Sequence, residues 1–156
     1  MAAPQFIHLR LHSEYSITDG AVRIDDAIQA ACNDAMGALA LTDLGNLFGL
    51  IKFYSAARAG GVKPIAGADV WLSNEQEPDL PHRMLLLVQN HTGYLNLCQL
   101  LTKASLQNQV HGRAEVAPVA VGGGADEQVP VTGGEDPVGA GHRMEASGTG
   151  LDHLAV

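Results

Sequence analysis

The fold of this 156-residue chain is decided by ALALTDLGNLFGLIKFYSAARAGGVKPIAGADVW, residues 38–71. Residues 38–42 are an unbroken apolar run, which is typical of a strand buried on both faces of a parallel sheet. Residues 63–72 indicate a second strand with a glycine inside it. Between the two strands, apolar residues recur at helical spacing until the helix stops at Gly60-Gly61. The members of this helical face are Leu47, Leu50, Ile51, Tyr54 and Ala57. The stretch therefore predicts a βαβ unit.

The same alternation of strand and helix patterns extends to both sides of this unit. Residues 6–11 (FIHLRL) alternate in the manner of a strand, and residues 24–35 carry apolar positions at helical spacing. Residues 83–90 predict a further strand, and the helix after it is expected to use Thr92 as its N-cap. We therefore expect an α/β fold, made of three βαβ units around a parallel sheet.

The end of the chain differs sharply in composition. Residues 117–156 contain nine of the 18 glycines, no aromatic residue and no lysine, and they carry one arginine against six acidic residues. Such a composition predicts a low-complexity, disordered tail. We place a partial domain at residues 1–116 and the tail at residues 117–156. The origin of the tail stays open between a reading-frame change, a truncation with a foreign extension and a genuine regulatory segment.

Charge, cysteines and hydropathy narrow the classes of function. A net charge of −8 argues against a protein that holds nucleic acid by bulk electrostatics. Cys32 and Cys98 occur without a CxxC motif, so a cysteine zinc site is not expected. The N-terminus lacks the apolar run of a signal peptide, and no stretch approaches the roughly 20 apolar residues of a membrane span. We expect a soluble, cytoplasmic protein with no membrane partner.

Polar residues follow the predicted strands, at the ends where parallel sheets gather their functional groups. His12 follows residues 6–11, Asp43 follows residues 38–42, and Asp69 lies late in residues 63–72. Imidazole and carboxylate are ordinary ligands of Zn²⁺ or Mn²⁺. An alternative stays open, because an aspartate after a strand is also a common turn residue and a histidine there often makes only a hydrogen bond.

Three stretches of the sequence together resemble one known family. They are HLRLHSEYSITDG (8–20), the stretch 38–71 quoted above, and LLLVQNHTGYLNLCQLLTKASLQNQ (85–109). They resemble the N-terminal PHP (polymerase and histidinol phosphatase) domain of bacterial DNA polymerase III alpha subunits of the replicative, proteobacterial type. The resemblance runs from about Phe6 to Glu115 and implies the first part of a distorted (βα)₇ barrel. It also implies a fragment, because the Mg²⁺-binding carboxylates of the polymerase site belong to a later part of such a subunit.

The motifs that hold metal in this family are altered in the sequence. Metal-competent PHP domains begin with a His-x-His pair, and alignment on HSEYS puts His12 at its second position and Arg10 at its first. A later Asp-His pair has Leu44 in place of its histidine, and a later strand histidine aligns with Arg83. The resemblance therefore implies a degenerate pocket rather than a complete metal site.

The carboxylates of that pocket are retained. Asp43 keeps the aspartate of the Asp-His pair, and Asp69 replaces a family glutamate with a shorter carboxylate. A guanidinium in a former cation pocket supplies positive charge without a metal. We expect Arg10 to pair with Asp43 or Asp69 and to fill the site.

The resemblance implies a structural role for this part of the subunit. The PHP domain would support the polymerase fold and dock the proofreading subunit, epsilon, and it would meet DNA only through the full holoenzyme. Template-directed DNA synthesis is the family's reaction, but we assign no catalytic residue, metal or cofactor to this chain, and whether it is an enzyme by itself stays open. The alternative is a metal-dependent phosphoesterase or 3′–5′ exonuclease, with Zn²⁺ or Mn²⁺ held by His12, Asp43 and Asp69.

Overall fold

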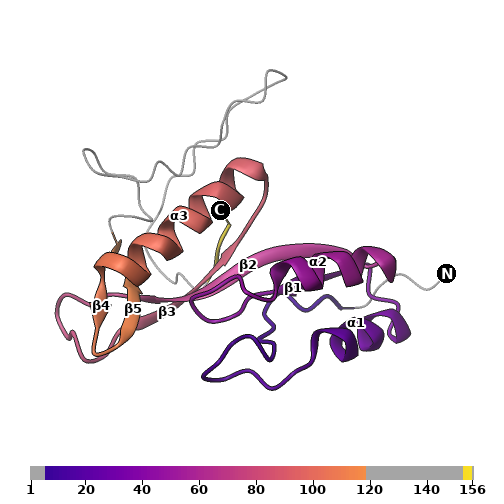
Figure 1. The fold of residues 1–156 in the computed structure, drawn as a ribbon, viewed down its shortest axis with the longest axis horizontal. Helices are drawn as coiled ribbons and strands as arrows, with labels where there is room; N and C mark the ends of the chain where they lie inside the picture. The colour runs from indigo at the N-terminus through magenta and orange to yellow at the C-terminus, as the bar shows by residue number, and fades with distance from the viewer. Residues whose placement is uncertain (1–5, 119–152, 156) are drawn as a thin grey trace. The chain divides into compact units, whose positions relative to one another are not determined.

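The computed structural model describes residues 6–118 and 153–155, and these residues belong to two compact units (Figure 1). The first unit comprises residues 6–69 together with Leu85–Leu87. The second unit comprises Val70–Met84 and, among the later described residues, 88–118 and 153–155. The predicted boundary at residue 116 remains a prediction, and the predicted tail lies outside the described residues except for residues 117–118 and 153–155.

The first unit contains the βαβ unit that the sequence predicts. Strand β1 (Ala38–Leu41) leads into helix α2 (Leu50–Ala59), which leads into strand β2 (Lys63–Leu72). The last three residues of β2, from Val70 onward, belong to the second unit. The two strands pair in parallel, with Ala38 opposite Lys63 and Leu41 opposite Ala66. All four residues of β1 are buried, as an unbroken apolar run predicts for a strand covered on both faces.

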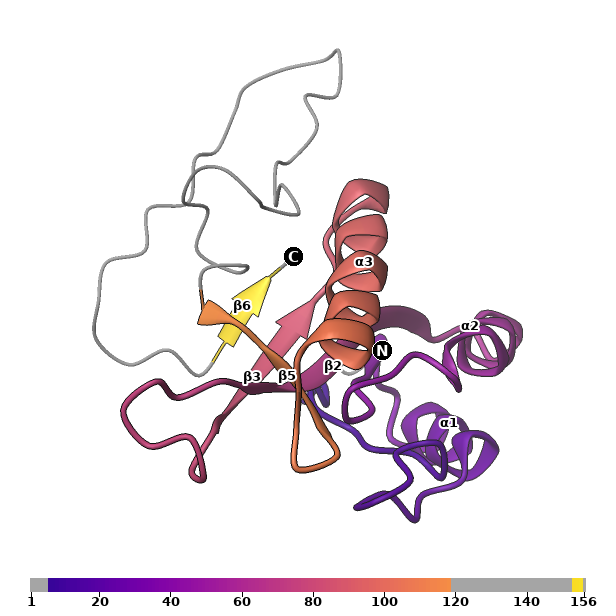
Figure 2. The ribbon, with the colours of Figure 1, turned by 60° about the vertical axis from the view of Figure 1, so that its left-hand side comes forward.

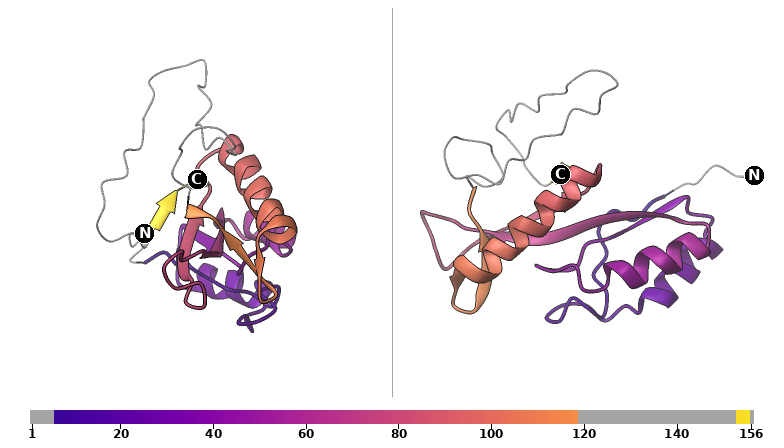
Figure 3. Two further views of the ribbon diagram at one scale, coloured as in Figure 1. Left: turned by 90° about the vertical axis from the view of Figure 1, so that its left-hand side faces the viewer. Right: turned by 45° about the horizontal axis from the view of Figure 1, so that its top comes forward.

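Helix α1 (Ile24–Asn33) precedes β1 and packs beside α2, as Figures 2 and 3 show from other sides. Asp25 and Asp26 lie in its first turn, where negative charge interacts favourably with the helix dipole. Its buried residues are spaced as the sequence predicts for one face of a helix. These residues are Ile24, Ile28 and Ala31.

Helix α2 presents a different face to the core from the one predicted. Its buried residues are Leu50, Phe53 and Ala57, whereas Ile51 and Tyr54 are 73% and 53% exposed. The reason is a close contact with α1 through two glycines that bound the helix. A Cβ atom at Gly60 would lie 3.2 Å from side-chain atoms of Ile28 and Cys32, and one at Gly49 would lie 3.1 Å from Ile24.

These contacts fix how α2 is rotated about its axis. On a helix with 100° between successive residues, Gly49 and Gly60 lie on nearly the same side, and Ile51 and Tyr54 lie on a different one. Ile51 and Tyr54 therefore lie on a side of α2 that faces away from α1. Together with Phe48, an exposed residue just before the helix, they form what we call the α2 flank.

Residues 6–11 do not form the regular strand that the sequence predicts. The segment bends at Leu9, and it joins β1 through separate hydrogen bonds. The Ala40 N–H donates to the carbonyl oxygen of His8 at 3.0 Å, and the Thr42 N–H donates to that of Leu11 at 2.9 Å. The hydroxyl oxygen of Thr42 accepts the Leu11 N–H at 2.9 Å, so a side chain takes the place of a ladder partner.

Strand β3 (His82–Leu87) begins in the second unit, and its last three residues, Leu85–Leu87, belong to the first. The second unit also contains helix α3 (His91–Gln107), followed by β4 (Gln109–Val110) and β5 (Arg113–Val116). Strand β5 pairs in parallel with the end of β2, and β4 pairs antiparallel with β5. A short strand, β6 (His153–Ala155), completes the strand order β4-β5-β2-β3-β6, with β1 also paired to β2.

The connections correct the prediction of three βαβ units around a parallel sheet. No helix lies between β2 and β3, whose connection is the polar segment of residues 73–81. The antiparallel pairing of β4 with β5 makes the sheet mixed. The connection from β2 to β3 is a loop without a helix, and such a loop can join strands that are neighbours in the sheet. A parallel βαβ unit needs a longer connection that usually contains a helix.

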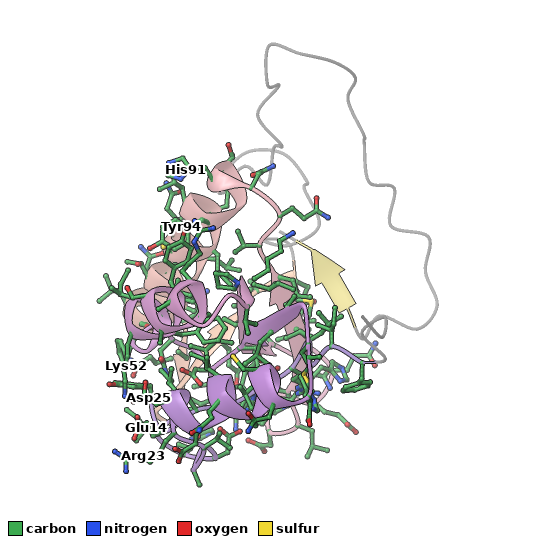
Figure 4. The ribbon with its side chains drawn as sticks, turned by 90° about the vertical axis from the view of Figure 1, so that its right-hand side faces the viewer. Glu14, Arg23, Asp25, Lys52, His91 and Tyr94 are labelled. Atoms are coloured by element: carbon green, nitrogen blue, oxygen red, sulfur yellow. The ribbon has the colours of Figure 1, made fainter. Side chains whose placement is uncertain are left out.

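Helix α3 begins two residues earlier than predicted. Asn90 has an extended backbone and its side-chain oxygen accepts the Gly93 N–H at 2.8 Å, so Asn90 and not Thr92 is the N-cap. The first turn carries His91 and Tyr94, whose rings stack with their centroids 6.4 Å apart (Figure 4). None of the helices in the described residues is long and apolar enough to cross a membrane.

Candidate functional site

Two aspartates from neighbouring strands form the base of the candidate site in the first unit. Asp43 follows β1, and Asp69 lies in β2. Their main chains are hydrogen-bonded, because the Asp69 N–H donates to the Asp43 carbonyl oxygen at 3.2 Å and the Gly45 N–H donates to the Asp69 carbonyl oxygen at 2.7 Å. Both side chains are buried. Parallel pairing therefore brings together the two carboxylates that the sequence predicts.

Arg10 and His12 both bind the same carboxylate oxygen. Arg10 donates from Nε to Oδ2 of Asp69 at 2.8 Å, and its terminal Nη2 also contacts that oxygen. His12 places Nε2 3.1 Å from the same atom. The Asp69 side chain is 0% exposed and that of Arg10 is 51% exposed, so a buried negative charge is compensated from the solvent side.

His12 lies between two carboxylates. Its Nδ1 is 3.0 Å from Oδ1 of Asp19, while its Nε2 faces Asp69. A neutral imidazole has one donor and one acceptor nitrogen, whereas the protonated ring donates from both. His12 therefore bridges the two carboxylates, one through each ring nitrogen.

Asp43 is held by neutral donors rather than by an arginine. It accepts the Ser13 N–H at Oδ1 (2.6 Å) and the Ser13 hydroxyl at Oδ2 (2.9 Å). Burial raises the pKa of Asp43 above its ordinary value, and this effect outweighs the two Ser13 hydrogen bonds and the nearby His12, which lower it. Asp69, and not Asp43, is thus the partner of Arg10.

The remaining predicted pocket residues contribute in other ways. Leu44 has no side-chain donor or acceptor, but its N–H donates to the Ser16 hydroxyl oxygen at 2.9 Å and its backbone bridges to Asp69. Arg83 belongs to the second unit, where its guanidinium carbon lies 4.5 Å from the centre of the Trp71 ring. That distance is within the range of a cation–π interaction.

The sequence pattern does not predict two further residues of this site, Ser16 and Asp19. The Ser16 hydroxyl donates to Oδ1 of Asp19 at 2.6 Å and accepts the Leu44 N–H, so it links the loop after residue 12 to the end of β1. The available signal was the Ser-x-x-Asp spacing in that loop, which is typical of side chains that hydrogen-bond locally. Nothing in the sequence pattern predicts that the loop returns Asp19 to His12.

Surface charges fasten the same loop to both helices of the first unit (Figure 4). Lys52 on α2 places Nζ 3.2 Å from Glu14 and 3.5 Å from Asp25 of α1. The hydrogen bond to Glu14 is the main reason that the pKa of Lys52 is raised. Lys52 also lies 5.9 Å from the centre of the Tyr15 ring. The loop is therefore held from outside as well as from the buried side.

A separate ion pair lies in the second unit. Arg113 donates from Nε and Nη2 to one oxygen of the buried Glu115, at 2.9 and 2.7 Å. Its guanidinium carbon is also 5.4 Å from the centre of the Trp71 ring. Because Trp71 and Glu115 are paired across β2 and β5, this cluster reinforces the contact between those two strands.

The donor set of the first unit has few of the ligands that a transition metal uses. In the described part of the chain, no group of three or more histidine, cysteine, aspartate or glutamate side chains has an arrangement that could hold a metal ion. The Asp69 oxygen that would face a cation already contacts Arg10 and His12.

The chain is similar in sequence to one protein family and to several known proteins. Residues 8–121 match the family described as "PHP domain". The chain is 48% identical over 120 residues to "DNA polymerase III subunit alpha" of Neisseria meningitidis, covering 76% of this chain and 10% of that protein. It is 48% identical over 108 residues to the subunit of the same name in Pseudomonas fluorescens, covering 69% of this chain and 9% of that one. The chain thus spans about a tenth of the length of these relatives.

A solved structure shares the fold. The crystal structure of a protein from Bifidobacterium adolescentis, described as a metal-dependent phosphoesterase, matches with a TM-score of 0.50 at 16% identity. The match covers 65% of this chain and 34% of that one, and at this identity it concerns the fold alone. The expected α/β fold of PHP type is confirmed, and the match over residues 8–121 shows that the chain belongs to the PHP domain family.

Proposed function

We propose that this chain is the beginning of the PHP domain of a bacterial DNA polymerase III alpha subunit, where it serves as a metal-poor structural scaffold. The observation that carries the proposal is the contact of Arg10 and His12 with the buried carboxylate of Asp69. An arginine is always charged and presents fixed donors, so it provides permanently the positive charge that a metal would supply.

The surrounding residues do not fit a zinc or manganese ion well. A Zn²⁺ ion at this position would have to displace the Arg10 guanidinium from Asp69, and Zn²⁺ in proteins usually takes four ligands, or three and a water. Leu44 brings no ligand atom where metal-competent members of the family have a histidine. Asp43 is engaged by two donors from Ser13 and has a raised pKa, which disfavours the ionised form that a metal requires.

The scaffold role follows from what the pocket connects. Its hydrogen bonds and ion pairs connect three segments: residues 10–19, the turn after β1, and Asp69 in β2. Charge-assisted hydrogen bonds are stronger than neutral ones and fix geometry. A pocket of this kind holds the ends of neighbouring strands together, and the polymerase would be supported by that rigidity.

The wider role rests on the family and its relatives. We propose that the remainder of the alpha subunit is the immediate partner, that the epsilon proofreading subunit docks on the PHP domain, and that DNA is met only in the full holoenzyme in the cytoplasm. The names of the relatives support membership of an alpha subunit. Template-directed DNA synthesis, with its Mg²⁺ ions, would be the activity of the whole subunit.

Calorimetric titration of Zn²⁺ and of Mn²⁺ tests the metal-poor pocket. The expected result is the absence of stoichiometric tight binding in the parent chain, and no better binding than in an Arg10→Ala control. Tight binding of one ion per chain to the parent would overturn the proposal. Circular dichroism of both samples establishes that each is folded before the titration is interpreted.

The enzymatic alternative uses the same residues and has a separate test. If His12, Asp43 and Asp69 held a working metal, the chain would cleave a phosphate ester such as p-nitrophenyl phosphate, and the 3′ end of single-stranded DNA, in the presence of Zn²⁺ or Mn²⁺. Asp43→Ala would abolish that activity. Metal-dependent cleavage with this loss in the variant would favour the phosphoesterase or exonuclease over the scaffold.

A further inference from the structure

We draw no further inference here: the strongest candidate, the α2 flank formed by the exposed side chains of Phe48, Ile51 and Tyr54, carries no proposal because nothing in the structure shows what covers it.

Discussion

Replacing Arg10 with methionine removes a guanidinium that contacts the buried Asp69 carboxylate, while keeping a long, unbranched side chain. Two hydrogen-bonding contacts to Oδ2 of Asp69 are lost, while the contact from His12 at 3.1 Å is kept. Because the Asp69 side chain is fully buried, water does not replace the lost donors without a rearrangement of the pocket. We therefore expect Arg10→Met to destabilise the first unit.

The expected loss of stability depends on how deeply the Arg10 and Asp69 side chains are buried. Two unit charges about 4 Å apart interact by about 4 kcal/mol at an effective dielectric constant of about 20. Arg10 is half exposed, which screens the pair, and hydrogen bonds to charged groups contribute about 1.5–3 kcal/mol. We expect Arg10→Met to lower the free energy of unfolding by about 2 kcal/mol.

Urea unfolding followed by circular dichroism measures this change, with size-exclusion chromatography to establish that the sample is monomeric. Arg58→Met is the matched control, since it removes an exposed arginine from α2, and it should change stability by less than about 0.5 kcal/mol. The double variant Arg10→Met/Asp69→Asn should be less destabilised than the sum of the single variants. Equal midpoints for Arg10→Met and Arg58→Met would refute the reasoning.

Three further predictions concern other parts of the chain. Burial raises the pKa of Asp43, so the folded state binds the proton of this carboxyl more tightly than the unfolded state does. The stability gained from that proton is complete below the unfolded pKa of 3.8 and is lost as pH rises through the folded pKa. Asparagine does not titrate, so Asp43→Asn should become more stable relative to the parent between about pH 4 and pH 7. Gly20→Ala places a Cβ atom 1.8 Å from the Ser13 carbonyl oxygen and should cost about 3 kcal/mol in urea unfolding. Asn90→Ala removes the N-cap of α3 and should lower the free energy of unfolding by about 1 kcal/mol.

Each of these predictions has its own control. Gly37→Ala meets nothing within 4 Å of the added Cβ atom and should be tolerated where Gly20→Ala is not. Thr92→Ala should have a smaller effect than Asn90→Ala, and the reverse order would mean that the helix begins at Thr92. A stability difference between Asp43→Asn and the parent that stays constant with pH would contradict the assigned effect of burial.

The sequence was most informative where structure is set by local pattern. The βαβ unit is predictable because an apolar run, a helical period and a second strand follow one another between Ala38 and Leu72. The face of α2 was not predictable, because it depends on the approach of α1 to Gly49 and Gly60. Both Asn90 and Thr92 are good capping residues, and only the backbone conformation decides between them.

The pocket divides in the same way. Strand ends identify Asp43 and Asp69 as neighbours, because parallel strands gather their carboxyl ends at one edge. The sequence predicts that Arg10 pairs with either Asp43 or Asp69, and in the structure Arg10 donates to Asp69. Asp19 was missed because its position depends on a loop whose return is possible only where Gly20 lies against Ser13.

Strand β2 has a consequence for how the chain comes to be folded. Its first residues pair with β1 at a separation of 25 positions, from Ala38 to Lys63, while its last residues pair with β5 at a separation of 44, from Trp71 to Glu115. The entropy of closing these two loops differs by only about 0.5 kcal/mol. The two pairings also differ in when they can form during translation. Both β1 and β2 have been synthesised before β5 is made, so the pairing of β1 with β2 can form first. We expect the amino-terminal end of β2 to acquire its ladder during translation, so that it becomes the template on which the later strands assemble.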